Sequence, residues 1–331
     1  MRIISKIFRW ALKSMGLLLA MVILAGLVFR LFAPVPQPPG ELIDVGGFSL
    51  HINATGAQND KPTLLIESGA GAPSEYYYWL GEMLKDSMRV VRYDRAGIGY
   101  SDLSDAPRDP ETIAGELHTL LEKAGESPPY ILAGHSYGGH YIRVFTALYP
   151  DEVAGLVFID APHPNSSERL NMPPEPKFLK ALYKVGAVTG DLGVLGLGDR
   201  ILGPILRAPG LPEEVTNRYF DYTLNGKYLW GYLEEEKWYP ELVERSGGIN
   251  DFGSRPIRVF AGTNLNEKAL LKMGLNPEEI RTERRKMQEE IAGLSTNGQA
   301  FFLEGGHITI FSLKENAAII CKEILKLLVE L

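Results

Sequence analysis

The stretch Gly134-His135-Ser136-Tyr137-Gly138 decides the fold expected for this chain, because it fits the pattern G-x-S-x-G. A short apolar run, 130–133, precedes it, and residues 140–148 follow with the apolar spacing of a helix. Ser136 is therefore expected on a sharp turn from a buried strand into a helix. The flanking glycines let the backbone close tightly and leave the serine hydroxyl within reach of a base. This context favours a nucleophile over a chance loop serine.

Length and composition are those of an ordinary globular protein. The chain has 331 residues, of which 45% are hydrophobic and 23% charged, and this suits one α/β core with an insertion. The net charge is −7, and because residues 1–33 hold five basic residues and no acidic one, the rest of the chain carries −12. Nucleic acid is therefore not expected as a partner. Cys321 is the only cysteine, which excludes internal disulfides and cysteine metal sites, and we expect it in packing.

The N-terminal segment 1–33 is expected to anchor the protein in a membrane. Basic residues up to Lys13 precede an almost wholly apolar run, 15–29, which resembles a signal-peptide core or a short membrane helix. The run ends in Leu31-Phe32-Ala33-Pro34, where a proline follows the candidate cleavage site, so an uncleaved anchor is favoured over a cleaved signal. Arg30 is able to reach the interface. The basic flank predicts a cytoplasmic N-terminus and a catalytic part on the extracytoplasmic side.

The rest of the chain divides into a spacer, a core and an insertion. Residues 34–40 are rich in proline and form a stiff, extended spacer. Apolar strands alternate with helices over residues 41–162 and again over 251–331, which predicts a mostly parallel sheet flanked by helices. This alternation lapses over 163–250, and we predict that this segment is a helical lid inserted into the core.

With the serine turn placed in this series, the chain resembles the α/β-hydrolase superfamily over nearly all of residues 41–331. Two further stretches carry the resemblance: residues 94–102, Asp-Arg-Ala-Gly-Ile-Gly-Tyr-Ser-Asp, are similar to a loop of these enzymes, and Gly305-Gly306-His307 is similar to their terminal histidine loop. The resemblance implies an α/β-hydrolase fold with a catalytic serine, acid and histidine in that chain order.

Ser136 is the expected nucleophile and His307 the expected base. His307 follows the last predicted strand on a Gly-Gly loop that is flexible enough to aim an imidazole at Ser136. The imidazole accepts the serine proton and returns it to the leaving group, while a carboxylate fixes its tautomer. The other histidines are expected at surface, packing or substrate-lining positions; they are His51, His118, His135, His140 and His163.

The acid departs from the commonest pattern of the superfamily. Many members carry an aspartate after the strand equivalent to residues 257–261, but the loop there reads Gly262-Thr263-Asn264-Leu265-Asn266-Glu267. Asp160 ends the strand directly after the serine turn, where the strand ends of a parallel sheet meet. Haloalkane dehalogenases supply an acid from that strand, so the resemblance makes Asp160 the expected acid. Glu267 and Glu304 are the alternatives.

The oxyanion hole is expected to use the backbone N–H of Tyr137 and one N–H of the loop Ser68-Gly69-Ala70-Gly71. Ala70 is the expected donor and Gly71 the alternative. Superfamily members commonly have His-Gly-x in this loop, and Ser68 replaces the histidine here. Backbone donors do not depend on that side chain. The loop lacks the third glycine of a dinucleotide-binding motif.

The insertion and its aromatic residues bear on the substrate. Residues 185–212 are glycine-rich and apolar, and such a stretch suits an acyl-chain site or the underside of a lid packed on the core. The aromatic residues of 76–79 and of 228–239 are expected in the core, at the rim or along a cleft. Glu234-Glu235-Glu236 is interpreted as a solvated face or, by resemblance to proline iminopeptidases, as a site for a substrate amine.

These features predict a membrane-anchored serine hydrolase that cleaves carboxylic esters of small to moderately hydrophobic molecules through an acyl-enzyme on Ser136. One alternative is an amidase or aminopeptidase of the proline-iminopeptidase type on the same triad, and another is a non-catalytic binding domain or a lyase on the same fold. No cofactor and no metal are expected, since a serine nucleophile needs neither and no cluster has ligand spacing. A serine in the turn also argues against dehalogenase or epoxide hydrolase chemistry, for which relatives place an aspartate.

Overall fold

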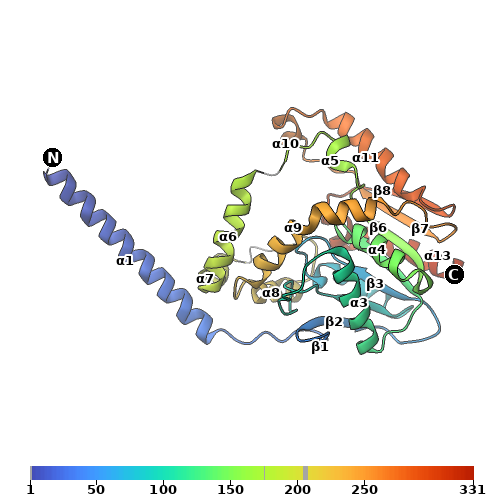
Figure 1. Ribbon diagram of the computed structural model, residues 1–331, viewed down its shortest axis with the longest axis horizontal. Coiled ribbons are helices and arrows are strands. Elements are labelled where there is room, and N and C mark those ends of the chain that lie inside the picture. The colour runs from blue at the N-terminus through green and yellow to red at the C-terminus, as the bar shows by residue number, and fades with distance from the viewer. Residues whose placement is uncertain (1, 175, 204–207) are drawn as a thin grey trace.

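A helix-flanked sheet with one projecting helix makes up the computed structural model, which describes residues 2–174, 176–203 and 208–331 (Figure 1). The sheet has eight strands in the order β1-β2-β4-β3-β5-β6-β7-β8. The strands are β1 (Glu41–Asp44), β2 (Ser49–Thr55), β3 (Thr63–Glu67), β4 (Val90–Tyr93), β5 (Tyr130–His135), β6 (Val153–Ile159), β7 (Ile257–Gly262) and β8 (Gly298–Leu303). Strand β2 runs antiparallel to β1 and β4, and the other neighbours are parallel. The predicted mostly parallel sheet is confirmed.

Helices cover both faces of this sheet, as its continuously apolar central strands require. On one face lie α3 (Pro110–Ala124), α4 (Gly138–Leu148) and α11 (Pro277–Ala292), and on the other α2 (Tyr78–Leu84), α12 (Thr309–Ser312) and α13 (Lys314–Glu330). Leu117, Phe145 and Ile291 contribute to the first core layer. The second layer contains Phe311 and the buried Cys321. Short elements η1 (Ser74–Tyr77), η2 (Pro150–Glu152) and α10 (Glu267–Lys272) complete the body.

Helices follow one another between β6 and β7. They are α5 (Ser166–Arg169), α6 (Lys177–Asp191), α7 (Val194–Leu202), α8 (Glu213–Tyr222) and α9 (Lys227–Gly247). We call α6 and α7 the outer cap and α8 and α9 the inner cap. Ile205 and Leu206, in the apolar stretch between α7 and α8, lie outside the described residues.

The inner cap is held on the core by polar contacts. In α8, Arg218 forms an ion pair with Glu75, and the hydroxyl of Tyr222 donates to the other oxygen of Glu75 at 2.7 Å. At the start of α9, Lys227 Nζ donates to the carbonyl of Ser101 at 2.6 Å. Because these partners are buried or half-buried, the contacts fix the inner cap in one position over the strand ends.

The projecting helix α1 (Arg2–Phe32) is long and apolar enough to cross a membrane, with a mean hydropathy of 2.4 over its most apolar window. Its last turns pack against the start of α7, beside which it ends in Figure 1. A Cβ atom added at Gly26 would lie 2.6 Å from the carbonyl oxygen of Leu192, so only glycine permits this approach. Arg30 donates to the carbonyl of Asp191. The outer cap is thus attached to α1.

The proline-rich spacer is tied to the sheet at its end. The buried ring of His51 lies between the carbonyl oxygen of Pro39, 2.6 Å from Nε2, and the carboxylate of Asp94, 2.7 Å from Nδ1. Both partners only accept hydrogen bonds, so both ring nitrogens carry protons and His51 is a cation. Burial acts to lower the pKa of His51, but the Asp94 charge outweighs it and the pKa is raised. The protonated ring joins spacer and core.

Candidate active site

Ser136 lies on the turn between β5 and α4 with a left-handed backbone, φ 52°. Among the described residues other than glycine, only Asp160 (φ 43°) and Asn171 (φ 49°) also have a positive φ. Such a conformation is costly for a residue with a Cβ atom, and it tends to persist where a site requires it. The strain therefore coincides with two of the residues expected in the triad.

The glycines around Ser136 serve close approach rather than a left-handed turn. None of Gly134, Gly138 and Gly139 has a positive φ. A Cβ atom at Gly134 would collide with the backbone of Gly138, and one at Gly138 would collide with the carbonyl of Glu67. The serine itself thus takes the strained conformation, and the glycines allow α4 to begin against neighbouring strands.

Asp160 and His307 form a hydrogen-bonded pair at the carboxyl edge of the sheet. Asp160 Oδ2 lies 2.7 Å from His307 Nδ1, on the loop after β8. The Ser136 N–H donates to the carbonyl of Ile159 at 3.2 Å, which sets the serine beside the end of β6. With Nδ1 donating to Asp160, Nε2 of a neutral His307 is left as the proton acceptor. The structure thus brings the three expected residues to one edge.

Sequence reasoning missed a cation that contacts the candidate acid. Arg284 in α11 donates to Asp160 Oδ1 at 3.0 Å, and the N–H of Gly262 donates to the same oxygen at 3.0 Å. Burial acts to raise the pKa of Asp160, but the hydrogen bond from His307 and the Arg284 charge outweigh it, so the pKa falls below its usual range. Asp160 is therefore a carboxylate at neutral pH. The pattern of α11 is that of a charged helix and carries no signal for this contact.

The alternative acids lie elsewhere. Glu267 begins α10, and its carboxylate forms an exposed ion pair with Arg281 at 3.0 Å. Glu304 is exposed, and its carbonyl accepts from Asn316 at 2.9 Å. Among the hydrogen bonds and ion pairs of the described residues, neither carboxylate contacts His307. The geometry therefore favours Asp160 as the acid.

The loop after β3 holds Ala70, the expected backbone donor of the oxyanion hole, between two glycines whose N–H groups are already bound. The N–H of Gly71 donates to Glu235 Oε2 at 2.9 Å, and that of Gly69 donates to the hydroxyl of Tyr77 at 3.0 Å. Within the described part of the chain, no hydrogen bond occupies the N–H of Ala70 or of Tyr137. These two amides are the pair expected to form the oxyanion hole.

A buried charge cluster holds this loop in place. The Arg95 guanidinium lies between the carboxylates of Glu67 in β3 and Glu235 in α9, and it donates to the carbonyls of Ser68 at 2.8 Å and Gly69 at 2.7 Å. Burial raises the pKa of Glu67 despite the Arg95 charge. The inner cap thus supplies a carboxylate that orients the loop.

The expectation of a solvated face is wrong for the second residue of the acidic triplet. Glu235 is 1% exposed, and its carboxylate already accepts hydrogen bonds from Arg95 and Gly71. Glu236 accepts from the hydroxyl of Tyr137 at 2.7 Å. Glu234 alone fits the solvated interpretation, with an exposed pair to Lys237.

A chain of hydrogen bonds through Tyr77 and His135 joins the loop after β3 to the loop that bears His307. His135 Nε2 lies 3.0 Å from the carbonyl oxygen of His307, and Nδ1 lies 2.8 Å from the hydroxyl of Tyr77. A carbonyl only accepts, so Nε2 carries the proton and Nδ1 accepts from Tyr77. Burial lowers the pKa of His135 well below its usual value, which keeps the ring neutral. His135 therefore positions the loop that bears His307.

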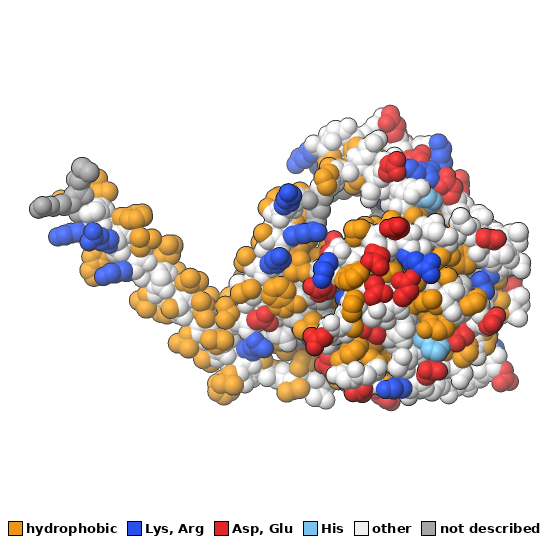
Figure 2. All heavy atoms as spheres, in the orientation of Figure 1, with side chains coloured by type: hydrophobic (Ala, Val, Ile, Leu, Met, Phe, Trp, Pro, Cys, Tyr) orange, Lys and Arg blue, Asp and Glu red, His pale blue; other side chains and the backbone are white. Residues whose placement is uncertain are grey.

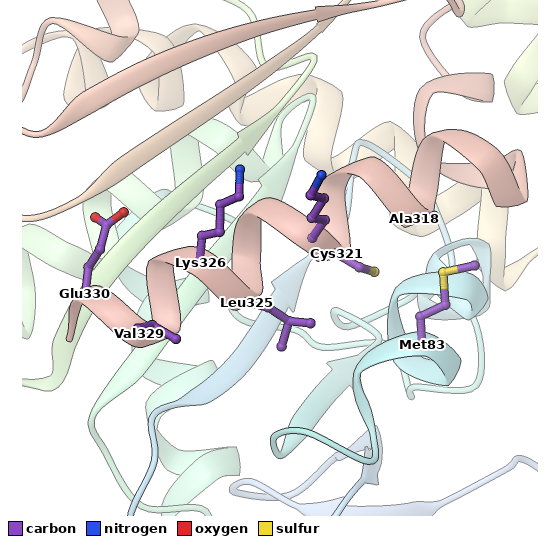
Figure 3. A pocket seen from close by; sticks show the side chains of 8 residues that line it. Met83, Ala318, Cys321, Leu325, Lys326, Val329 and Glu330 are labelled. Carbon is purple, nitrogen blue, oxygen red and sulfur yellow. The ribbon is translucent and has the colours of Figure 1, made fainter.

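An apolar cavity of about 730 Å³ leads from the outer cap to this edge of the sheet. Leu182, Val185 and Leu195 of the outer cap line it, together with Tyr228 of the inner cap, and it reaches Ala70. Its size and lining are those of a small-molecule site. A second cavity of about 670 Å³ lies along α13, where Cys321 and Met83 contribute to its lining (Figure 3). None of the expected triad residues is among the lining residues of either cavity.

A metal centre is not apparent at the candidate site. Among residues 2–174, 176–203 and 208–331, no group of three or more His, Cys, Asp or Glu side chains is arranged to hold a metal ion. The charged side chains near the strand ends instead pair with one another, as the Arg95 cluster does.

Comparison with known proteins identifies the fold. Residues 62–184 match the family model described as the alpha/beta hydrolase fold. A putative lipase from Acinetobacter baumannii AYE has a TM-score of 0.60 at 17% identity, covering 94% of this chain and 97% of that chain, which shows a shared fold. Residues 62–184 thus match the alpha/beta hydrolase model, and the chain has the α/β-hydrolase fold that its sequence motifs predicted.

Curated relatives match only in part. An uncharacterized protein, YbdG of Bacillus subtilis (strain 168), is 27% identical over 165 residues, 48% of this chain and 51% of that protein. The (lyso)-N-acylphosphatidylethanolamine lipase of Homo sapiens is 30% identical over 163 residues, 47% of this chain and 45% of that protein. The match spans about half the length of these relatives. The fold supports a hydrolase, whereas the bond it cleaves has to be argued from the site.

Proposed function

We propose that the protein is a serine hydrolase that cleaves carboxylic esters of small to moderately hydrophobic molecules through an acyl-enzyme on Ser136. The observation that carries the proposal is the Asp160–His307 hydrogen bond of 2.7 Å beside a serine held at a positive φ. The apolar cavity that ends at Ala70 supports an apolar acyl group. The lipase among the relatives supports an ester bond as the target.

The proposed reaction uses groups of this chain alone. Ser136 Oγ attacks the carbonyl carbon while its proton passes to His307 Nε2, and the N–H groups of Ala70 and Tyr137 stabilise the oxyanion. The intermediate then collapses, the C–O bond breaks, and the alcohol leaves with the proton from His307. Water attacks the acyl-enzyme with His307 again as the base, which releases the acid and restores the serine.

The same proposal makes α1 a single-pass anchor. Lys6, Arg9 and Lys13 precede the apolar part of α1, which favours a cytoplasmic N-terminus and a catalytic body on the extracytoplasmic side. Removing residues 1–36 is expected to give a soluble, active enzyme. If expression of the full-length gene instead yields a soluble protein from which residues 15–29 have been removed, the segment is a cleaved signal.

A fluorophosphonate probe tests the nucleophile. We expect the wild-type protein to be labelled and Ser136→Ala to be unlabelled, with turnover lower by about 10⁴ or more and an unchanged fold by circular dichroism. Labelling of that variant at the wild-type rate would refute Ser136, and an unlabelled, inactive wild type would favour a non-catalytic or lyase role.

Ester and amide substrates separate the remaining alternatives. We expect hydrolysis of p-nitrophenyl esters and little turnover of aminoacyl amides, because the buried Glu235 that would bind the amine already pairs with Arg95. A higher kcat/KM on prolyl amides than on every ester would establish the aminopeptidase alternative.

A further inference from the structure

Helix α6 of the outer cap exposes an apolar stripe that no other part of the described chain covers. At 100° per residue, Phe178, Leu182, Val185 and Val188 fall on one side of the helix. Their exposure is unusual for large apolar side chains, reaching 67% at Phe178. The opposite side of α6 packs on α9.

Lysines run along one edge of this stripe. Lys177, Lys180 and Lys184 are all exposed and lie on the next sector of the helix. Figure 2 shows blue and orange side chains next to one another over α6. A helix that exposes an apolar face bordered by lysines has the pattern of a segment that lies in a membrane interface.

The contact between the outer cap and α1 indicates that the stripe faces the bilayer that would surround α1. Gly26 contacts Leu192 and Val194 at the start of α7, and Gly26 lies six residues before the end of α1 at Phe32. At about 1.5 Å per residue, this contact lies roughly 9 Å inside the end of the helix, within the depth of the headgroup region. A bilayer that holds α1 therefore reaches the outer cap.

We propose that the outer cap inserts its exposed α6 stripe into the bilayer that holds α1, and that substrate acyl chains pass from this bilayer into the apolar cavity. Leu182 and Val185 belong both to the stripe and to the cavity lining, so the cavity adjoins the stripe. The cavity then continues to Ala70, which follows Gly69 in the chain, and a Cβ atom added at Gly69 would lie 3.1 Å from Ser136 Cβ. This inference rests on the proposed function and narrows its substrate class to membrane-resident lipid esters.

The first test measures insertion of the α6 stripe into a bilayer and does not require enzymatic activity. The full-length protein is labelled with an environment-sensitive fluorophore at Phe178→Cys, because the native Cys321 is buried and its thiol pKa is raised to about 12 by burial. It is reconstituted in phosphatidylcholine–phosphatidylglycerol vesicles with and without a nitroxide on the lipid chain. Val329→Cys, on an 87% exposed apolar side chain of α13, is the matched control.

We expect roughly half of the emission at position 178 to be quenched by the nitroxide lipid and the control to be unaffected. Equal quenching at both positions, or none at 178 in protein that floats with the vesicles, would overturn insertion of the outer cap. Protein that does not float would overturn α1 as the anchor, and the proposal with it. The quenching measurement does not depend on catalysis by Ser136. Its outcome is therefore independent of whether the proposed hydrolase function is correct.

The second test measures whether substrate reaches the cavity from the bilayer. Phe178→Ser with Val188→Ser removes apolar side chains that do not line the cavity, and Val329→Ser is the control. We expect hydrolysis of a long-chain monoacylglycerol in vesicles to fall roughly tenfold in the double variant, with p-nitrophenyl butyrate hydrolysis unchanged. An equal loss on both substrates, or no loss on the vesicle substrate, would overturn delivery from the bilayer.

Discussion

The two halves of the cap pack on each other, but their contacts with the rest of the molecule differ. The inner cap is fixed to the core through buried charged partners, such as Glu235 with Arg95 and Arg218 with Glu75. The outer cap contacts α1 through close backbone packing at Gly26 and exposes apolar side chains. Polar contacts are directional and fix geometry, whereas apolar surface tolerates many partners. The inner cap is therefore fixed to the candidate catalytic edge, whereas the outer cap lines the apolar cavity and meets α1.

This difference predicts that changes at the catalytic edge reduce turnover of every substrate, and the largest effect is expected at the acid. Asp160→Asn removes the charge that stabilises protonated His307 and favours the wrong tautomer, so kcat is expected to fall by roughly 10⁴ on short and long esters alike. The melting temperature should change little. Steady-state kinetics on two p-nitrophenyl esters, with calorimetry, provides the measurement.

Glu267→Gln is the matched control, because it changes the alternative acid in the same way. It is expected to stay within about tenfold of wild type. The reverse ranking of these two variants would move the acid to the loop after β7 and refute the assignment of Asp160.

Glu235→Gln tests whether the inner cap is part of the catalytic edge. The variant leaves the buried Arg95 with one carboxylate, and removing one partner of a buried charge pair costs about 3 kcal/mol of unfolding free energy. Urea denaturation measures this loss, and Glu234→Gln, at an exposed position of the same triplet, should cost less than about 0.5 kcal/mol. Equal stability of the two variants would mean that the cluster does not fix the inner cap.

Acid should weaken the inner cap through His140. Its ring contacts Ser246 of α9 at 2.7 Å, and burial, with the Arg143 charge, lowers its pKa to about 3. Between pH 6.5 and about 3 the unfolded chain therefore binds a proton that the native state does not bind, so this group lowers stability by up to about 1.4 kcal/mol per pH unit as pH falls.

Urea unfolding from pH 7.5 to 4.5 checks this sign. His140→Gln should lose stability less steeply than wild type over that interval, because the variant lacks the group that the unfolded chain protonates. Parallel curves for wild type and His140→Gln would exclude His140 as the acid-sensitive contact.

The smallest effect is expected in the outer cap, where a change should alter preference among substrates. Leu195→Phe narrows the apolar cavity, so the ratio of kcat/KM for octanoate to butyrate esters is expected to fall roughly tenfold. Leu202→Phe, an exposed position outside the cavity lining, should leave that ratio unchanged. An equal fall in kcat/KM for both esters would mean that the outer cap affects catalysis and not the choice between acyl-chain lengths.

Local patterns in the sequence were enough to predict the fold. Apolar runs and their spacing predicted strand β5 before Ser136, helix α4 after it and the next strand, β6. The end of β6 predicted that Asp160 lies near Ser136. The short strand β1 and helix α2 were not predicted, because β1 is mostly exposed and α2 was interpreted as a group of aromatic residues. The family resemblance supplied the chain order of the triad.

Long-range polar pairs were beyond sequence reasoning. Arg95 and Glu235 are far apart in the chain, and a charged residue in a loop or an acidic triplet is most simply interpreted as solvated. Arg284 was hidden in the same way in a charged helix. Gly26 lies in an apolar run, where nothing distinguishes a packing position from a lipid-facing one. These contacts depend on tertiary structure alone.

With α1 as the proposed membrane anchor, the His51 contact with Pro39 limits how far the catalytic body can lie from that membrane. Only residues 33–38 remain free between the end of α1 and this attachment, and an extended chain of that length spans at most roughly 20 Å. With α1 as the anchor, the enzyme works within a thin layer above its own bilayer, where the effective concentration of substrate is set by lipid density and not by bulk solution. Turnover per enzyme should then follow the mole fraction of ester in the membrane and not the total amount of vesicles.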